Sequence, residues 1–173
     1  MSLGFSAARG IRSIMKEGRM KRSLKIAIFS IIVFTALAQL IRPERNSTDM
    51  IPQTDISRFV DLPADISGLL TAACYDCHTE NTVWPWYSNF SPVSWLVARD
   101  VKYGKERLNF SEWGDYSDMR KISKYVMICE LVESGAMPIL PYKLMHKEAR
   151  LTGDQRKVIC LWAEKQIEIM ENE

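Results

Sequence analysis

Apolar side chains recur at helical spacing through most of the chain beyond residue 55. After Pro63 they fall three or four residues apart, at Ile66, Leu70, Ala73 and Cys77. That spacing places them on one face of a helix. The chain shows no alternating apolar and polar run typical of a strand, and no internal repeat. The pattern therefore predicts an all-α domain with about four helices.

Three further helices are expected in this domain, separated by loops. The first covers residues 92–108 and begins with a proline, which suits the first helical position. The second covers residues 118–134, because Gly135 is the residue type preferred just past a helix end. The last begins after Thr152, where Thr and Gln three residues apart form a capping box. Residues 136–142 are expected to be an extended loop, because they contain two prolines.

Charge divides the chain into two parts. Residues 1–25 carry seven Lys and Arg and one acidic residue, whereas residues 42–173 carry sixteen basic and twenty acidic residues. The overall net charge of +2 therefore hides a basic N-terminal arm and a mildly acidic remainder. A nucleic-acid-binding protein would be expected to carry its basic patch on the folded domain, so nucleic acid is not an expected partner.

The basic arm leads into an uncharged run from Ile26 to Ile41. A basic segment before an apolar run is typical of an export signal. Residues 24–41 are just long enough to span a membrane, and the preceding Lys and Arg predict that the N-terminus stays inside. We expect a single-pass inner-membrane anchor with the C-terminal domain in the periplasm. The alternative is a soluble periplasmic protein, cleaved near Ala38 after the small-x-small pattern of residues 36–38.

This interpretation gives four segments: a basic cytosolic N-terminus (1–23), a transmembrane anchor or signal peptide (24–41), a linker (42–55) and a folded domain (56–173). The linker is polar, holds two prolines and lacks periodicity.

The main chemical signal is C-x-x-C-H, formed by Cys74, Cys77 and His78. This motif is the signature of covalent haem attachment. Its two thiols form thioethers with the haem vinyl groups, and its histidine is the proximal iron ligand. A zinc site would need a second ligand pair, and a thioredoxin-type pair would need a βαβ context. We expect one covalent haem c, with an oxidised or structural C-x-x-C pair as the alternative. Cys129 and Cys160 are expected to be buried thiols or a disulfide.

The sixth iron ligand is predicted to be Met137. It precedes Pro138, in a stretch expected to be extended and stiff, where a thioether could be held over a haem face. His146 is the only other histidine and the alternative distal ligand; Met145, or no ligand, remains open. His/Met ligation raises the reduction potential and closes the iron to small ligands.

Several polar and aromatic side chains are candidates to contact the haem. Four aromatic residues follow the motif and could line the pocket and exclude water, or could form an ordinary aromatic core: Trp84, Trp86, Tyr87 and Trp95. A haem propionate could take a hydrogen bond from Tyr142, Arg99 or Lys102, and the sequence does not choose among them.

Three stretches carry a resemblance to a known family: CYDCHTENTVWPWYSNFSPVSWLVARDV, LNFSEW and ESGAMPILPYKLMHKEARLT. Together they resemble the small bacterial haem-binding domain family of C-x-x-C-H proteins, which is similar in general plan to monohaem cytochromes c. The resemblance covers about residues 56–165. It implies a helical cytochrome-c-like fold, covalent haem at Cys74 and Cys77, and His78 as proximal ligand. The family's M-P motif matches Met137-Pro138.

These observations favour an electron carrier over an enzyme. We expect a membrane-anchored protein that transfers single electrons through its haem to redox partner proteins, with no catalytic residue and no small-molecule substrate. One alternative is a haem-based sensor or peroxidase-like accessory domain with an open or His-ligated iron, in which His146 is the only histidine available as a distal base. Another is an interaction domain without haem that uses C-x-x-C structurally.

Overall fold

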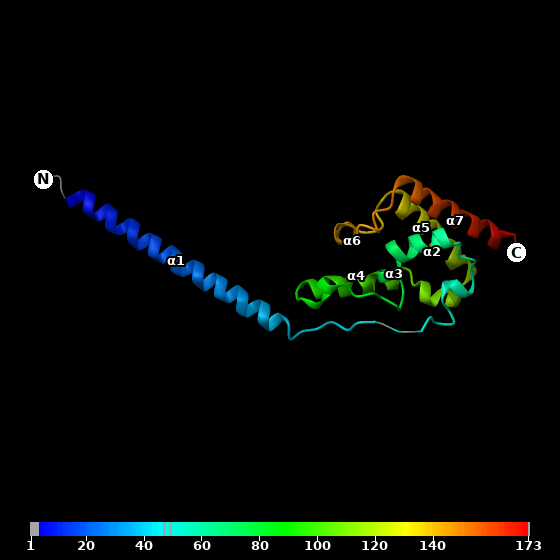
Figure 1. Ribbon diagram of the computed structural model, residues 1–173, viewed down its shortest axis with the longest axis horizontal. Helices are drawn as coiled ribbons and strands as arrows, with labels where there is room; N and C mark the ends of the chain where they lie inside the picture. Colours follow the sequence, from blue (N-terminus) through cyan, green and yellow to red (C-terminus); the bar gives the residue numbers. More distant parts are fainter. Residues whose placement is uncertain (1–3, 47, 49, 173) are drawn as a thin grey trace. The chain divides into compact units, whose positions relative to one another are not determined.

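The computed structural model describes the backbone of residues 4–46, 48 and 50–172, and the side chains of these residues from Met20 onward. All regular structure in this part of the chain is helical (Figure 1). The prediction of an all-α protein is therefore confirmed. The chain divides into two compact units: a first unit of Met1–Pro43 with Tyr87–Trp95, and a second unit of Glu44–Trp86 with Leu96–Glu173.

The first unit contains the long helix α1 (Gly4–Ala38). Just past its C-terminal end, the side-chain amide of Gln39 pairs with the backbone of Ser91. Gln39 Nε2 donates to the Ser91 carbonyl, and Gln39 Oε1 accepts from the Ser91 N–H, both at 3.0 Å. The Trp95 indole N–H donates to the Ile41 carbonyl at 2.8 Å. These bonds fasten residues 87–95 to the end of α1.

The predicted membrane anchor is wrong, because no helix in the described residues combines the length and the apolar character needed to cross a bilayer. Lys21, Arg22 and Lys25 lie within α1, so its uncharged part is confined to residues 26–38. A helical stretch of this length rises only about 20 Å. The hydrocarbon core of a bilayer is about 30 Å thick. The predicted localisation in the inner membrane and periplasm depended on this anchor and is therefore also wrong.

The second unit holds the remaining helices and most of α4. Its elements are η1 (Ile56–Arg58), α2 (Ala64–Ala73), α3 (Tyr75–His78), η3 (Phe110–Asp115), α5 (Asp118–Glu133), α6 (Leu140–Met145) and α7 (Gly153–Glu171). Helices η2 (Trp86–Asn89) and α4 (Val93–Arg107) have residues in both units. Helices α5 and α7 lie side by side, and α2 packs against α7 (Figure 1). Helix α3 contacts both α2 and η3.

A row of aromatic rings in contact forms the centre of this unit. Phe110, Trp113, Tyr125 and Trp162 make successive contacts, with ring centroids 6.2, 4.9 and 5.5 Å apart. All four side chains are buried. Burial of each large apolar side chain contributes about 1.5–3 kcal/mol, so this row is a major source of stability. It runs from η3 through α5 to α7 and ends at Phe110, beside the C-x-x-C-H segment.

Local sequence signals account for most helix boundaries. The predicted capping box forms at α7, where the Thr152 N–H donates to Gln155 Oε1 at 2.8 Å and the Gln155 N–H donates to Thr152 Oγ1 at 3.2 Å. Gly135 has φ of +72°, as expected for a residue just past a helix end. The extended loop predicted for residues 136–142 is only partly correct, because α6 begins at Leu140. Pro141 is tolerated there, since the first helical turn needs no N–H donor.

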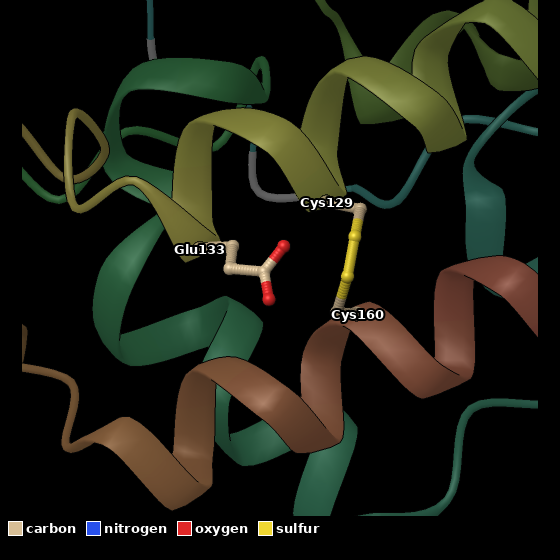
Figure 2. Close-up of side chains that lie close together, drawn as sticks. All are labelled: Cys129, Glu133 and Cys160. Carbon is tan, nitrogen blue, oxygen red and sulfur yellow. A yellow bond between two sulfur atoms is a disulfide. The ribbon is translucent and has the colours of Figure 1, made fainter.

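A disulfide between Cys129 and Cys160 joins α5 to α7, with Cα atoms 4.5 Å apart. Of the two states left open by the sequence, the structure contains the disulfide. Figure 2 shows the Glu133 carboxylate beside it. The two sulfurs are bonded to each other and offer no thiolate to a metal ion. This group is therefore a structural bridge between helices.

Candidate functional site

The C-x-x-C-H segment is a single helical turn set against the end of a longer helix. Helix α2 ends at Ala73, and Cys74 breaks it with φ of −128° and ψ of −41°. The Cys74 carbonyl then accepts the N–H groups of Cys77 and His78, at 3.1 and 3.0 Å. This turn gathers both cysteines and the histidine, and both thiols are free and only partly buried.

The two thiols are not a preformed thiolate pair. Burial, and then the neighbouring Cys77, raise the pKa of the Cys74 thiol to about 12. Burial, and then the charges of Asp76 and Asp100, raise the pKa of the Cys77 thiol to about 12. Reactive redox cysteines have lowered pKa values, so this environment does not favour a thiol redox pair. Among the described residues, neither cysteine belongs to a cluster of three metal-binding side chains, which weakens the zinc interpretation.

The imidazole of His78 is held in one orientation. Its Nδ1 lies 2.9 Å from the carbonyl oxygen of Leu108. A carbonyl only accepts, so Nδ1 carries the proton and Nε2 keeps its lone pair. Burial lowers the pKa of His78, against the opposing effect of the Leu108 and Gly104 carbonyls. A neutral imidazole with its Nδ1–H bonded to a backbone carbonyl is the form in which histidine ligates a metal through Nε2.

The Leu108 carbonyl is itself fixed by groups on both sides of it. Glu80, two residues after His78, accepts from Lys105 Nζ at 2.8 Å and from Asn109 Nδ2 at 3.0 Å. The Leu108 N–H donates to the Gly104 carbonyl at 2.9 Å, closing the last turn of α4. The carboxylate of Glu80 thus clamps the end of α4 where it meets the histidine.

Helix α4 passes directly over the motif because residue 104 is a glycine. A Cβ atom at Gly104 would overlap the carbonyl oxygen of Cys77 and lie 3.1 Å from its Cβ. Any larger residue would push α4 away from Cys77. The position of the Leu108 carbonyl relative to His78 therefore depends on this glycine.

Two cavities, of about 210 and 280 Å³, meet at His78. Both are lined by His78, Arg107 and Met137. Cys77 lines the smaller cavity and Cys74 the larger one, so each thiol faces one of them. The other lining side chains include Tyr103, Ile139 and Tyr142 in the smaller cavity and Phe110, Met127 and Leu131 in the larger one.

Of the two residues predicted as distal ligands, Met137 lines both of these cavities. Its N–H donates to the Leu131 carbonyl at 2.9 Å, and its side chain is partly buried against the core. His146 is not among the residues that line either cavity. Its Nδ1 lies 3.2 Å from a Glu148 carboxylate oxygen, and its ring stacks on Tyr142 with centroids 4.1 Å apart. The structure thus brings Met137 together with the C-x-x-C-H residues, while iron ligation by either side chain stays a prediction.

None of the four aromatic residues predicted to line a haem pocket is among the residues that line the two cavities. The Trp84 indole N–H donates to the Asn46 carbonyl at 2.8 Å, and the Arg45 guanidinium lies 5.1 Å from its ring centre. Trp86 is 70% exposed, and neither tryptophan is among the cavity-lining residues. Tyr87 and Trp95 belong to the first unit. A role for these four side chains at a haem stays a prediction.

Tyr142, a propionate candidate, does line the smaller cavity, whereas sequence reasoning missed Phe110 and Arg107. Phe110 contacts the His78 ring edge-on, with centroids 6.4 Å apart. The only signal for it was its place in the LNFSEW stretch. Arg107 ends α4 and lines both cavities, and no sequence signal indicated this position. Arg99, a propionate candidate, pairs with Asp100 at 2.8 Å, and Lys102 is exposed.

The fold and the site define an all-helical domain that surrounds a neutral, oriented histidine with two thiols and apolar cavities. A family model described as haem-binding domain matches residues 33–165, which is more than half of the chain. The chain therefore belongs to the haem-binding domain family and is a haem-binding protein. No curated protein and no solved structure matches it.

Proposed function

We propose that this protein is an electron carrier that holds one haem covalently through Cys74 and Cys77. In this proposal His78 is the proximal iron ligand and Met137 the distal one. The observation that carries it is the His78 imidazole, whose Nδ1 is engaged by the Leu108 carbonyl at 2.9 Å. This contact leaves Nε2 as the ligating atom and holds the ring at the point where both cavities meet.

The surrounding residues fit the chemistry of a haem. A thiol faces each cavity, which suits two thioether links on one macrocycle. The walls are mainly apolar, and Arg107 supplies a cation beside both cavities that could pair with a propionate. Bound haem would supply an iron centre that gains and loses one electron.

Met137 supports a carrier rather than a catalyst. A thioether at the distal position closes the iron to small ligands and raises the reduction potential. A peroxidase-like site would instead need a distal base at the cavity, and His146 is not among the lining residues. The sensor and peroxidase-like alternative therefore has no supporting observation in the described part of the chain.

The test compares full-length Met137→Ala with Met145→Ala, a methionine whose side chain is 53% exposed. We expect the wild type and Met145→Ala to give low-spin, six-coordinate spectra and a reversible one-electron wave. Met137→Ala should lose the low-spin spectrum, bind cyanide readily and show a lowered reduction potential. A Met137→Ala protein with the spectrum and potential of the wild type would refute the proposed ligation.

A further inference from the structure

We propose that a hydrogen bond between Tyr142 and Asp76 latches the Met137 loop onto the C-x-x-C-H turn, and thereby sets how firmly Met137 holds the iron. This inference rests on the proposed haem function. The Tyr142 hydroxyl donates to Asp76 Oδ2 at 2.8 Å, across 66 residues of sequence. It joins α6, which follows Met137, to α3, which carries Cys77 and His78 and directly follows Cys74.

The acceptor end of the latch is fixed. Asp76 lies between Cys74 and Cys77 on α3. Its second oxygen, Oδ1, accepts from the Val83 N–H at 3.2 Å. The carboxylate is thus oriented by the chain that follows the motif and offers its other oxygen to the tyrosine.

The donor end belongs to a loop that is anchored at its start and held at its far end by the latch. Near the start, the Met137 N–H donates to the Leu131 carbonyl at 2.9 Å, which ties the loop to α5. Lys143 Nζ donates to the Gly135 carbonyl at 3.0 Å, which closes the loop on itself. Neither bond reaches α3. The Tyr142–Asp76 bond makes that connection and so fixes Met137 relative to His78.

Tyr142 is also braced from outside the cavity. The His146 ring stacks on it nearly parallel, with an interplanar angle of 11°. His146 is in turn within 3.2 Å of Glu148. This arrangement restricts the tyrosine ring to the orientation in which its hydroxyl reaches Asp76. His146 thus supports the latch by packing against the Tyr142 ring.

The first measurement is imidazole binding to the ferric, haem-loaded full-length protein, because imidazole must displace Met137. A hydrogen bond to a charged acceptor is strong enough that Tyr142→Phe should tighten imidazole binding by about tenfold or more. Tyr103→Phe removes a hydroxyl from the same cavity without touching Asp76, and should change the affinity far less. In a Met137→Ala background, Tyr142→Phe should have no further effect, because the latch acts through Met137.

The second measurement does not require haem. Loss of the latch should speed exchange of the hydrogen-bonded amides of Met137 and Lys143, which donate to the Leu131 and Ile139 carbonyls, by about tenfold in Tyr142→Phe, and not in Tyr103→Phe. Unchanged exchange in this loop would overturn the latch whether or not haem is bound. An equal effect of Tyr142→Phe on imidazole affinity with and without Met137 would also overturn it. A wild type that takes up no haem would refute the proposed function, and the exchange result would still decide the latch.

Discussion

Replacing Gly104 with alanine tests whether α4 must lie against Cys77 for this domain to form. A methyl group at this position would overlap the Cys77 carbonyl oxygen and lie 3.2 Å from its carbonyl carbon. The obstructing atoms are backbone, so they cannot rotate away as a side chain would. Gly68, in the interior of α2, is a matched control, because a methyl group there would have no atom within 4 Å.

The comparison of the two variants isolates the cost of the overlap. Both glycines are in helices, and alanine should stabilise either helix by about 1 kcal/mol. Gly68→Ala should show this gain. Gly104→Ala should add an overpacking cost of about 1–3 kcal/mol, so it should be less stable than Gly68→Ala by that amount. For a domain of this size, the difference corresponds to roughly 4–12 °C in the midpoint of thermal unfolding.

Chemical and thermal unfolding of the full-length protein measure this difference. The same samples can be assayed for haem content, which should fall in Gly104→Ala because the Leu108 carbonyl moves with α4. The reasoning would be refuted if Gly104→Ala were as stable as Gly68→Ala and took up as much haem as the wild type.

Two other predictions concern the groups that hold this domain in place. Glu80→Ala removes the acceptor of two hydrogen bonds beside Leu108 and should lower the free energy of unfolding by about 1–2 kcal/mol in urea titrations; an unchanged midpoint would contradict the clamp. Cys129→Ser/Cys160→Ser opens a loop of 31 residues and should cost about 2–4 kcal/mol, a loss that a reductant should reproduce in the wild type and not in the variant.

Short-range signals in the sequence predicted the elements that short-range contacts determine. The capping box at Thr152 and the left-handed Gly135 each depend on residues within a few positions of one another. The same is true of the all-helical pattern. These features could be read without knowing which helices pack together.

The remaining features depend on contacts between distant residues or on competing local effects. The partner of His78 is a backbone carbonyl thirty residues away, which has no side-chain signature. The Tyr142–Asp76 bond is likewise long-range. Pro141 suggested an extended loop, although a proline in the first turn of α6 costs no hydrogen bond. The membrane prediction treated the run to Ile41 as one span, whereas the helix carries charges up to Lys25 and ends at Ala38.

Covalent haem attachment tests the central claim most directly. The full-length protein should be expressed in a host that matures C-x-x-C-H cytochromes, beside Cys74→Ala/Cys77→Ala and a control cytochrome, and run on a denaturing gel stained for haem. The account predicts haem that stays with the wild-type band and is absent from the double variant. A wild-type band without haem, under conditions in which the control cytochrome matures, would contradict it.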